Sequence, residues 1–376
     1  MQELLGTQYI DITLVIALQV ILLGFIGGIL SGFIGSGGAF FMTPGMMNLG
    51  VDGVMAVASN IAHKFGKALI GSRKHAAAGN VDKKLAAYML ATAILGVQIA
   101  VAINNYLFTG GGDSHGAPKG AGANLYISIV FAGILSVVAV SMLRDIMKSK
   151  TNGEADGGPS MKIAQYLSRL NLPPVINFPV ADVRVSLWVL MAVGTATGYL
   201  AGTIGVGGFI GVPAMIYVFG IPTAVASGTE LFLAMFMGAY GAISYAYQGY
   251  VDLRLTMLLY LGSLVGIHLG VYGVKVVNEK YIRVTTSLII LLCVVSRIIA
   301  VPVYLRQLGY LNFDPAWDAG FNMTSKVFLF LSGISGALVI LLQVIRAYRQ
   351  RRKIQKTLLV VREGGPSRQV EPLQAA

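Results

Sequence analysis

Long apolar runs are the feature that most limits what this chain can fold into. Examples are ITLVIALQVILLGFIGGILSGFIG, AAYMLATAILGVQIAVAI, LYISIVFAGILSVVAVSML and VFLFLSGISGALVILLQVI. A helix needs about 20 such residues to cross the hydrocarbon core of a bilayer, where backbone groups find no water to bind. Only 12% of the residues are charged, whereas about a quarter are charged in soluble domains. A β-barrel would show short alternating segments instead. The sequence therefore predicts an all-α polytopic membrane protein.

The positive charge of the chain is concentrated outside these runs. The formal net charge is +12, and much of the excess lies in the C-terminal RAYRQRRKIQKTLLVVREGGPSRQ and in loops between spans. Positive charge on the cytoplasmic side of a membrane explains this pattern more simply than a nucleic-acid partner does. Cys293 stands alone, so we expect neither a disulfide framework nor a cysteine metal cluster. We also expect no cofactor. The segment MQELLGTQYID has no basic region or cleavage site of a signal peptide, so we expect it to belong to the mature chain.

A glycine-rich segment occurs twice in the chain. GFIGGILSGFIGSGG (24–38) aligns with GTATGYLAGTIGVGG (194–208), and every matching glycine is shifted by 170 positions. Each copy continues into a half-length apolar segment with one proline, then into AVAS, and later into GNVD or GYVD. An internal duplication is the simplest explanation.

Loop charges predict that the two copies face opposite ways. The loop GSRKHAAAGNVDKK is basic and is expected in the cytoplasm. The basic tail is expected inside. The matching GYVD loop is three spans before the tail, at about 323–346, 281–301 and 254–276, so it is expected outside. Each repeat then holds a full helix, a glycine-broken or re-entrant segment and three more helices. We predict two inverted repeats with about nine full transmembrane helices plus two half-length segments, an external N-terminus and a cytoplasmic C-terminus.

The same pattern predicts how the chain is divided. In order, the expected parts are a first transmembrane repeat (1–147), a cytoplasmic linker (148–184), a second inverted repeat (185–303), an external loop with an extra transmembrane helix (304–346) and a basic cytoplasmic tail (347–376).

The glycine breaks are the first candidate binding site. Glycine can adopt positive φ and allows close approach of another group, and a helix that restarts after a break presents free N–H groups and a positive dipole end to an anion. Such amides are tolerated in a membrane only where they line a cavity or are buried in protein. The predicted substrate-binding residues here are Gly35, Ser36, Gly37, Gly38, Gly205, Gly207 and Gly208. The alternative is close helix packing, which fits Gly24, Gly28 and Gly32 well.

Polar side chains in the following helix form the second candidate site. Asn60, His63, Lys64 and Lys67 are spaced to lie on one helix face. A charge within a span is costly and usually faces a cavity or a partner. A cationic stripe beside exposed amides suits an anion, and His63 could also relay protons. The alternative for Lys67 is that its amine reaches the membrane interface along its own stem.

The second copy has an acid at the corresponding place. Ser227, Thr229 and Glu230 are therefore added to the predicted binding residues. Glu230 is expected either to pair with Lys64 or Lys67 or to titrate as substrate moves, and a purely structural ion pair is the alternative.

Three further groups of polar residues are expected to be structural. We interpret His268 as a core histidine whose hydrogen bonds are satisfied, and Arg297 as a residue near a helix end that reaches outward. Asp82 and Asp252 each close a GxVD sequence and are expected to cap the next helix.

Taken together, the duplicated glycine-rich stretch, its proline, AVAS and GxVD resemble the TauE/SafE family of sulfite-exporter-like membrane proteins. The resemblance covers roughly residues 12 to 300. It implies a multi-pass transporter of the bacterial inner membrane for small sulfur-containing or organic anions such as sulfite or sulfoacetate. It fixes neither substrate nor direction. The long linker, the extra C-terminal span and the basic tail depart from the short members of the family.

These observations favour a secondary transporter that works by alternating access, with coupled protons and a homodimer left open. The alternative is an anion channel or a permease for another small anion. An enzyme is not expected, because the chain has no His-Glu-x-x-His, no paired aspartates in facing helices and no Ser-His dyad at matching depth. A membrane scaffold or receptor would leave the polar stripe unexplained.

Overall fold

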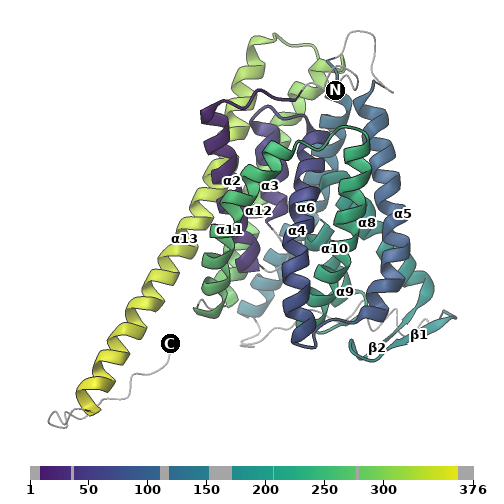
Figure 1. The fold of residues 1–376 in the computed structure, drawn as a ribbon. Coiled ribbons are helices and arrows are strands. Elements are labelled where there is room, and N and C mark those ends of the chain that lie inside the picture. The colour runs from purple at the N-terminus through teal and green to yellow at the C-terminus, as the bar shows by residue number, and fades with distance from the viewer. Residues whose placement is uncertain are drawn as a thin grey trace.

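The computed structural model describes residues 9–34, 38–110, 118–151, 172–205, 207–276 and 279–362. These residues form eleven helices and one two-stranded hairpin (Figure 1). The helices are α2 (Leu14–Ile34), α3 (Ala39–Asn48), α4 (Gly53–Ala77), α5 (Lys83–Phe108), α6 (Ala121–Thr151), α8 (Leu187–Ile204), α9 (Gly207–Tyr217), α10 (Thr223–Tyr247), α11 (Leu253–Val276), α12 (Glu279–Gln307) and α13 (Ala316–Arg362). The strands β1 (Val175–Phe178) and β2 (Val183–Ser186) pair antiparallel.

Seven of the described helices are long and apolar enough to cross a membrane: α2, α5, α6, α8, α11, α12 and α13. The prediction of an all-α polytopic membrane protein is therefore confirmed. The helices α4 and α10 have 25 residues each and fall outside this set. The two short helices α3 and α9, of 10 and 11 residues, each contain a proline and follow the glycine-rich segments.

The segments α2–α6 and α8–α12 have matching boundaries. The helices α4 and α10 begin 170 positions apart, as do α5 and α11, and α2 and α8 end at Ile34 and Ile204. Gly50 and Gly79 have positive φ, and so do Gly220 and Gly249, again 170 positions along. At this shift Ser59 corresponds to Thr229, and Asn60 to Glu230. The two AVAS sequences (56–59 and 224–227) are shifted by 168 positions, whereas the helix boundaries are shifted by 170. The AVAS match is therefore two positions out of register with the helices.

The helices of the two segments pack reciprocally. The helix α2 packs against α11 and α5 against α8, so the first helix of each segment contacts the fourth of the other. The helix α4 packs against α10, and α6 against α12. At Gly24, Gly28 and Gly32 a Cβ would collide with the α11 backbone at Leu259, Ser263 and Ile267. These three glycines thus allow close helix packing, as the alternative interpretation of the sequence predicted.

Side-chain contacts at the two ends of the bundle also link the two segments reciprocally. The backbone N–H of Asp252 donates to Ser59 Oγ at 3.1 Å, and that of Asp82 donates to Thr229 Oγ1 at 3.0 Å. The N-cap predicted for Asp82 is confirmed, because its Oδ1 accepts from Leu85 N at 2.9 Å. At the start of α11, Asp252 Oδ1 accepts from Arg254 N, also at 2.9 Å.

The two ends of the bundle are distinct in Figure 1. We call the end with residues 78–82 and the β1–β2 hairpin the lower end, and the end with residues 49–52 and 248–252 the upper end. The hairpin is held to the lower end because Asp82 Oδ2 accepts from Ala181 N at 3.1 Å. The helix α13 runs down past the bundle and extends well beyond its lower end (Figure 1).

Candidate functional site

The second glycine break ends one helix and starts a short one. The helix α8 ends at Ile204, and Gly205 follows in the left-handed conformation with φ of +75°. The short α9 begins at Gly207 and packs back on α8. Glycine adopts positive φ without steric strain, so the conformation predicted for this break is confirmed at Gly205.

The first break is described only in part. Gly35, Ser36 and Gly37 lie outside the described residues. Gly38 precedes α3 with φ of −73° and packs so closely on Gly27 that a Cβ would collide with its backbone. The helix α3 packs back on α2, as α9 does on α8.

Side chains from three other helices satisfy the end of α8. The carbonyl of Gly202 accepts from Tyr245 Oη at 2.8 Å, and that of Thr203 from Asn104 Nδ2 at 3.3 Å. The carbonyl of Ile204 accepts from Thr43 Oγ1 at 3.1 Å. The last carbonyls of a helix have no partner within it, and leaving them unpaired in an apolar interior is costly. The broken helix end is thus stabilised by donors that are far away in the sequence.

Sequence reasoning did not find Thr43, Asn104 and Tyr245. All three are fully buried polar side chains in apolar helices. Their positions inside apolar segments were the signal available in the sequence, because a polar group inside a membrane span usually has a partner. Their partners could not be identified without the packing of α3, α5 and α10 around the end of α8.

Asn60 connects α4 to α3. Its Nδ2 donates to Thr43 Oγ1 at 2.8 Å and to Ala39 O at 3.2 Å. The side chain is fully buried, and its Oδ1 has no hydrogen-bond partner. Because both amide hydrogens are engaged, Oδ1 is the atom left to accept a bond from a ligand or water.

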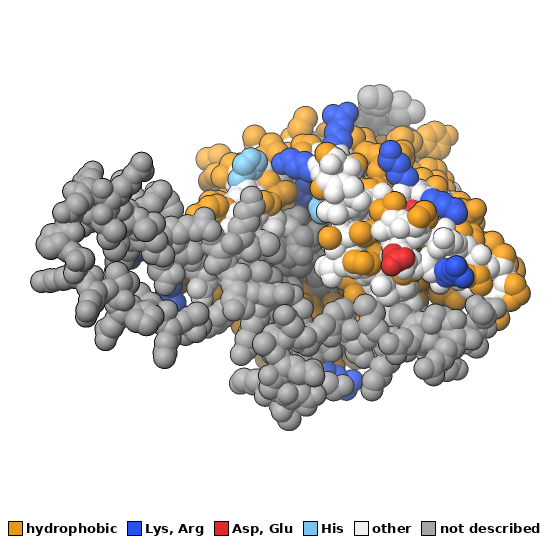
Figure 2. Space-filling model, turned by 90° about the horizontal axis from the view of Figure 1, so that it is seen from below, with side chains coloured by type: hydrophobic (Ala, Val, Ile, Leu, Met, Phe, Trp, Pro, Cys, Tyr) orange, Lys and Arg blue, Asp and Glu red, His pale blue; other side chains and the backbone are white. Residues whose placement is uncertain are grey.

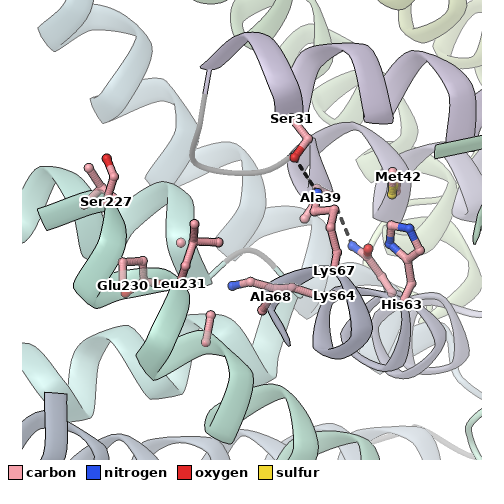
Figure 3. Close-up of a pocket in the computed structure, with 14 residues that line it drawn as sticks. Ser31, Ala39, Met42, His63, Lys64, Lys67, Ala68, Ser227, Glu230 and Leu231 are labelled. Carbon is pink, nitrogen blue, oxygen red and sulfur yellow. Dashed lines mark hydrogen bonds between the residues drawn. The ribbon is translucent and has the colours of Figure 1, made fainter. Parts of the chain in front are cut away.

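A small cavity lies where these helices meet, and we call it the central cavity. Its volume is about 30 Å³, which is room for about two water molecules. Residues from α2, α3, α4, α9 and α10 line it (Figure 3). They are Ser31, Ala39, Met42, Asn60, His63, Lys64, Lys67, Ala68, Gly208, Val212, Ser227, Glu230, Leu231 and Ala234.

The central cavity brings together most of the described residues that the sequence singled out. Asn60, His63, Lys64, Lys67, Gly208, Ser227 and Glu230 all line it. Gly205 borders a smaller neighbouring cavity that Lys64 also lines, and a Cβ at Gly207 would lie 3.0 Å from Lys64 Nζ. Gly38 and Thr229 do not line the central cavity: Gly38 packs on Gly27, and the Thr229 hydroxyl bonds Asp82 at the lower end.

The charges around the central cavity are not neutralised by close ion pairs among the described residues. Glu230 is 2% exposed, and neither of its carboxylate oxygens has a hydrogen-bond partner. The Lys64 amine points toward the side of the cavity that holds Glu230 (Figure 3), yet the structure shows no ion pair between them within 4 Å. The Lys67 amine donates instead to Ser31 Oγ on α2. The Glu230 carboxylate is thus available to a ligand or a proton, and Lys67 is held only by a neutral hydroxyl.

His63 is turned toward α11. Its Nε2 lies 2.7 Å from Ser263 Oγ, and its ring centroid lies 4.7 Å from that of Tyr260. The Tyr260 hydroxyl in turn donates to Ala62 O and accepts from Gly66 N, both at 3.1 Å. His63 is therefore a wall of the central cavity whose orientation is fixed by a neighbouring helix.

Two of the structural interpretations were wrong. Arg297 is 1% exposed and does not reach outward: its guanidinium donates to Asn48 Oδ1 and, at 3.0 Å, to Ser325 Oγ. Arg297 belongs to α12, and its guanidinium group lies beside Asn48, the last residue of α3. The helix dipole favours a cation at this C-terminal end. His268 is exposed rather than in the core, with its Nδ1 2.9 Å from Leu264 O.

Among the residues that the structure describes, no group of three or more His, Cys, Asp or Glu side chains is placed to hold a metal ion. The charged groups of the central cavity, Lys64, Lys67 and Glu230, are suited to an anion and a proton.

Comparison with known proteins adds independent information. The model of the family described as "Sulfite exporter TauE/SafE" matches residues 20–297, which include both glycine breaks and the central cavity. The "Probable membrane transporter protein YjnA" of Bacillus subtilis (strain 168) is 24% identical over 255 residues, which is 68% of this chain and 89% of the relative. No solved structure matches. The chain therefore belongs to the sulfite exporter TauE/SafE family of membrane transporters, as its duplicated motifs predicted.

Proposed function

We propose that this protein is a secondary transporter that carries a small sulfur-containing or organic anion across the bacterial inner membrane. One observation carries the proposal: two lysines, and an acid whose carboxylate oxygens have no hydrogen-bond partner, border a cavity between two broken helices. Charged groups inside a membrane protein are costly and mark ion or substrate pathways. The related protein of Bacillus subtilis has the printed name of a probable membrane transporter.

The electrostatics of the central cavity favour an anion as the cargo. Lys64 and Lys67 both line it, and the N-terminal end of α9 begins beside Lys64 at Gly207. A helix N-terminus adds free N–H groups and a positive dipole end to the two ammonium groups. Sulfite and sulfonates offer the negative oxygens that such a site binds through charge-assisted hydrogen bonds.

Alternating access would follow from two inverted repeats. The shift of 170 positions between helix boundaries, and the reciprocal packing of α2 on α11 and α5 on α8, support this relation. In such folds the broken helices of the two repeats meet at mid-membrane, and one part rocks against the other around the bound substrate. The reciprocal hydrogen bonds of Ser59 and Thr229 would then occupy equivalent positions at opposite ends.

Loop charges support one orientation. Basic residues at the C-terminal end of α4, at the start of α5 and at the C-terminal end of α13 belong to the lower end or extend beyond it. We therefore propose that the lower end faces the cytoplasm and that the upper end, with the N-terminal segment, faces outward.

Glu230 would couple the anion to a proton. Its carboxylate lies in the same small cavity as the anion site, so a bound anion favours the protonated acid by repulsion between like charges. Lys64 opposes this by attracting the ionised form, and a bound anion screens that attraction. Anion and proton would then cross together, and the proton would leave once the anion is released.

Radiolabelled sulfite and a small sulfonate in proteoliposomes test the proposal. A carrier gives flux that saturates at high substrate concentration, and Lys64→Met reduces it strongly because an ammonium group is removed from the cavity. Flux that rises without saturation would favour the alternative of an anion channel. Flux equal to that of empty liposomes with every anion tried would contradict transport of this class.

A further inference from the structure

A second and larger cavity lies directly below the central cavity. It has a volume of about 450 Å³ and lies between the C-terminal halves of α2, α4 and α11. Ser31, Lys67 and Leu231 line both cavities. Because all three helices end toward the lower end of the bundle, the larger cavity lies between the central cavity and that end.

The charges of this larger cavity have one sign. Among the residues that the structure describes, its ionisable lining residues are Lys67, Lys74, His75, His268 and the Tyr260 phenol, with no Asp or Glu. In Figure 2, which views this lower end, blue and pale-blue side chains are more prominent than red ones. The cavity at the upper end differs, because Asp52 and Asp252 line it. A cleft lined by one sign of charge concentrates ions of the opposite sign.

A thin layer of side chains separates the two cavities. The Lys67 amine crosses from α4 to donate to Ser31 Oγ on α2, as the dashed line in Figure 3 shows. Leu231 of α10 reaches toward α4, where a Cβ at Gly71 would lie 3.2 Å from its Cδ1. A neutral hydroxyl is a weaker partner for an ammonium group than an anion is. An arriving anion can therefore draw the Lys67 amine away from Ser31.

We propose that the larger cavity is the vestibule through which small anions reach the central cavity from the lower end, and that Lys67 on Ser31, together with Leu231, is its gate. The inference rests on the proposed function and adds to it the route, its charge selectivity and the end of the bundle from which the anion enters. Lys67 then acts twice, first as the gate and then as a cation of the binding site.

Cysteine labelling of the full chain in nanodiscs tests the vestibule. Ile267→Cys places a thiol in the vestibule, and Met55→Cys places one in the cavity at the upper end. The native Cys293 is fully buried, and the parent chain measures its background. We expect the anionic 2-sulfonatoethyl methanethiosulfonate to modify Ile267→Cys at least about tenfold faster than the cationic trimethylammonium reagent, after correction for their rates with a free thiol. Met55→Cys should show no such preference, and equal preference at both sites would overturn the vestibule.

Labelling of the central cavity tests the gate. Ala68→Cys places a thiol in a fully buried wall of the central cavity. We expect the anionic reagent to modify it slowly in the parent background and at least about tenfold faster when Lys67→Ala or Leu231→Ala removes half of the gate. Leu231→Ala keeps both lysines, so it separates the gate from the charge of Lys67. Equal rates in all three backgrounds would overturn the gate.

Cysteine labelling does not depend on transport, so the experiments can contradict the vestibule and the transporter independently of each other. Charge-selective labelling without any anion flux would contradict the transporter and leave the vestibule standing. Saturable flux with labelling that ignores reagent charge would contradict the vestibule and leave the transporter standing.

Discussion

Thr43 offers a sharp test of how the two broken helices are held together. Its hydroxyl accepts from Asn60 Nδ2 at 2.8 Å and donates to Ile204 O at 3.1 Å, and the side chain is fully buried. It therefore joins α3 to both α4 and the end of α8. Thr43→Val keeps the shape of the side chain but removes both hydrogen bonds.

The cost of Thr43→Val can be worked from these contacts. Each lost hydrogen bond costs about 1 kcal/mol of net stability, and a buried group left unpaired costs about 1–3 kcal/mol. Asn60 Nδ2 keeps its bond to Ala39 O and loses the one to Thr43, and the Ile204 carbonyl loses its side-chain donor. We expect the free energy of unfolding to fall by about 2–4 kcal/mol. Thr43→Ser keeps the hydroxyl and loses one methyl group, which costs about 1 kcal/mol.

The measurement is the unfolding free energy in mixed micelles, followed by SDS titration, for the parent and both variants. Transport by the same preparations shows whether the link between the broken helices also supports function, and we expect Thr43→Val to lose more flux than Thr43→Ser. If Thr43→Val is as stable as Thr43→Ser, the Thr43 hydroxyl does not hold these helices together.

Three further predictions follow from the structure. Glu230→Gln should leave anion flux that no longer accelerates when the external pH is lowered to impose an inward proton gradient, whereas parent flux accelerates; an unaltered pH response in the variant would rule out coupling through this acid. Gly198→Ala should sharply lower the yield of monodisperse protein in size-exclusion chromatography, because its Cβ would collide with the backbone of Ala93. The control Gly133→Ala, whose Cβ meets nothing within 4 Å, should leave that yield unchanged, since alanine in place of glycine is neutral or stabilises α6 by up to about 1 kcal/mol. Asp82→Ala should speed hydrogen exchange in the hairpin and at the start of α5, because it removes the acceptors for Ala181 N and Leu85 N. Asp82→Asn keeps one acceptor oxygen and should speed the exchange less. Equal exchange in the parent and both variants would contradict the role of Asp82 as acceptor for the hairpin and cap of α5.

Much of the architecture could be predicted because membrane proteins obey local rules. Apolar runs of spanning length predicted the helices, and the repeated glycines predicted where they break, as the positive φ of Gly205 confirms. The role of Gly24, Gly28 and Gly32 in close packing also followed from spacing alone, because helices that touch need small residues at every fourth position.

Contacts between distant parts of the chain could not be predicted. The donors to the end of α8 come from α3, α5 and α10, and no local pattern assigns Thr43 to a carbonyl 161 positions away. Arg297 was misplaced for the same reason. Its position near a helix end suggested an outward side chain, whereas packing against α3 and α13 gives it Asn48 and Ser325 as partners. The roles proposed for Lys64, Lys67 and Glu230 stay predictions, now with a cavity that brings them together.

The transported anion is proposed to bind in the cavity between the broken helices. The most direct test of this binding is isothermal titration of the purified protein with sulfite and with a panel of small sulfonates, in parallel with Lys64→Met. We predict that at least one anion binds the parent and that the variant binds it at least about tenfold more weakly, since a charge-assisted hydrogen bond in a buried site contributes about 1.5–3 kcal/mol. Equal dissociation constants for parent and variant would place the anion elsewhere and contradict the account.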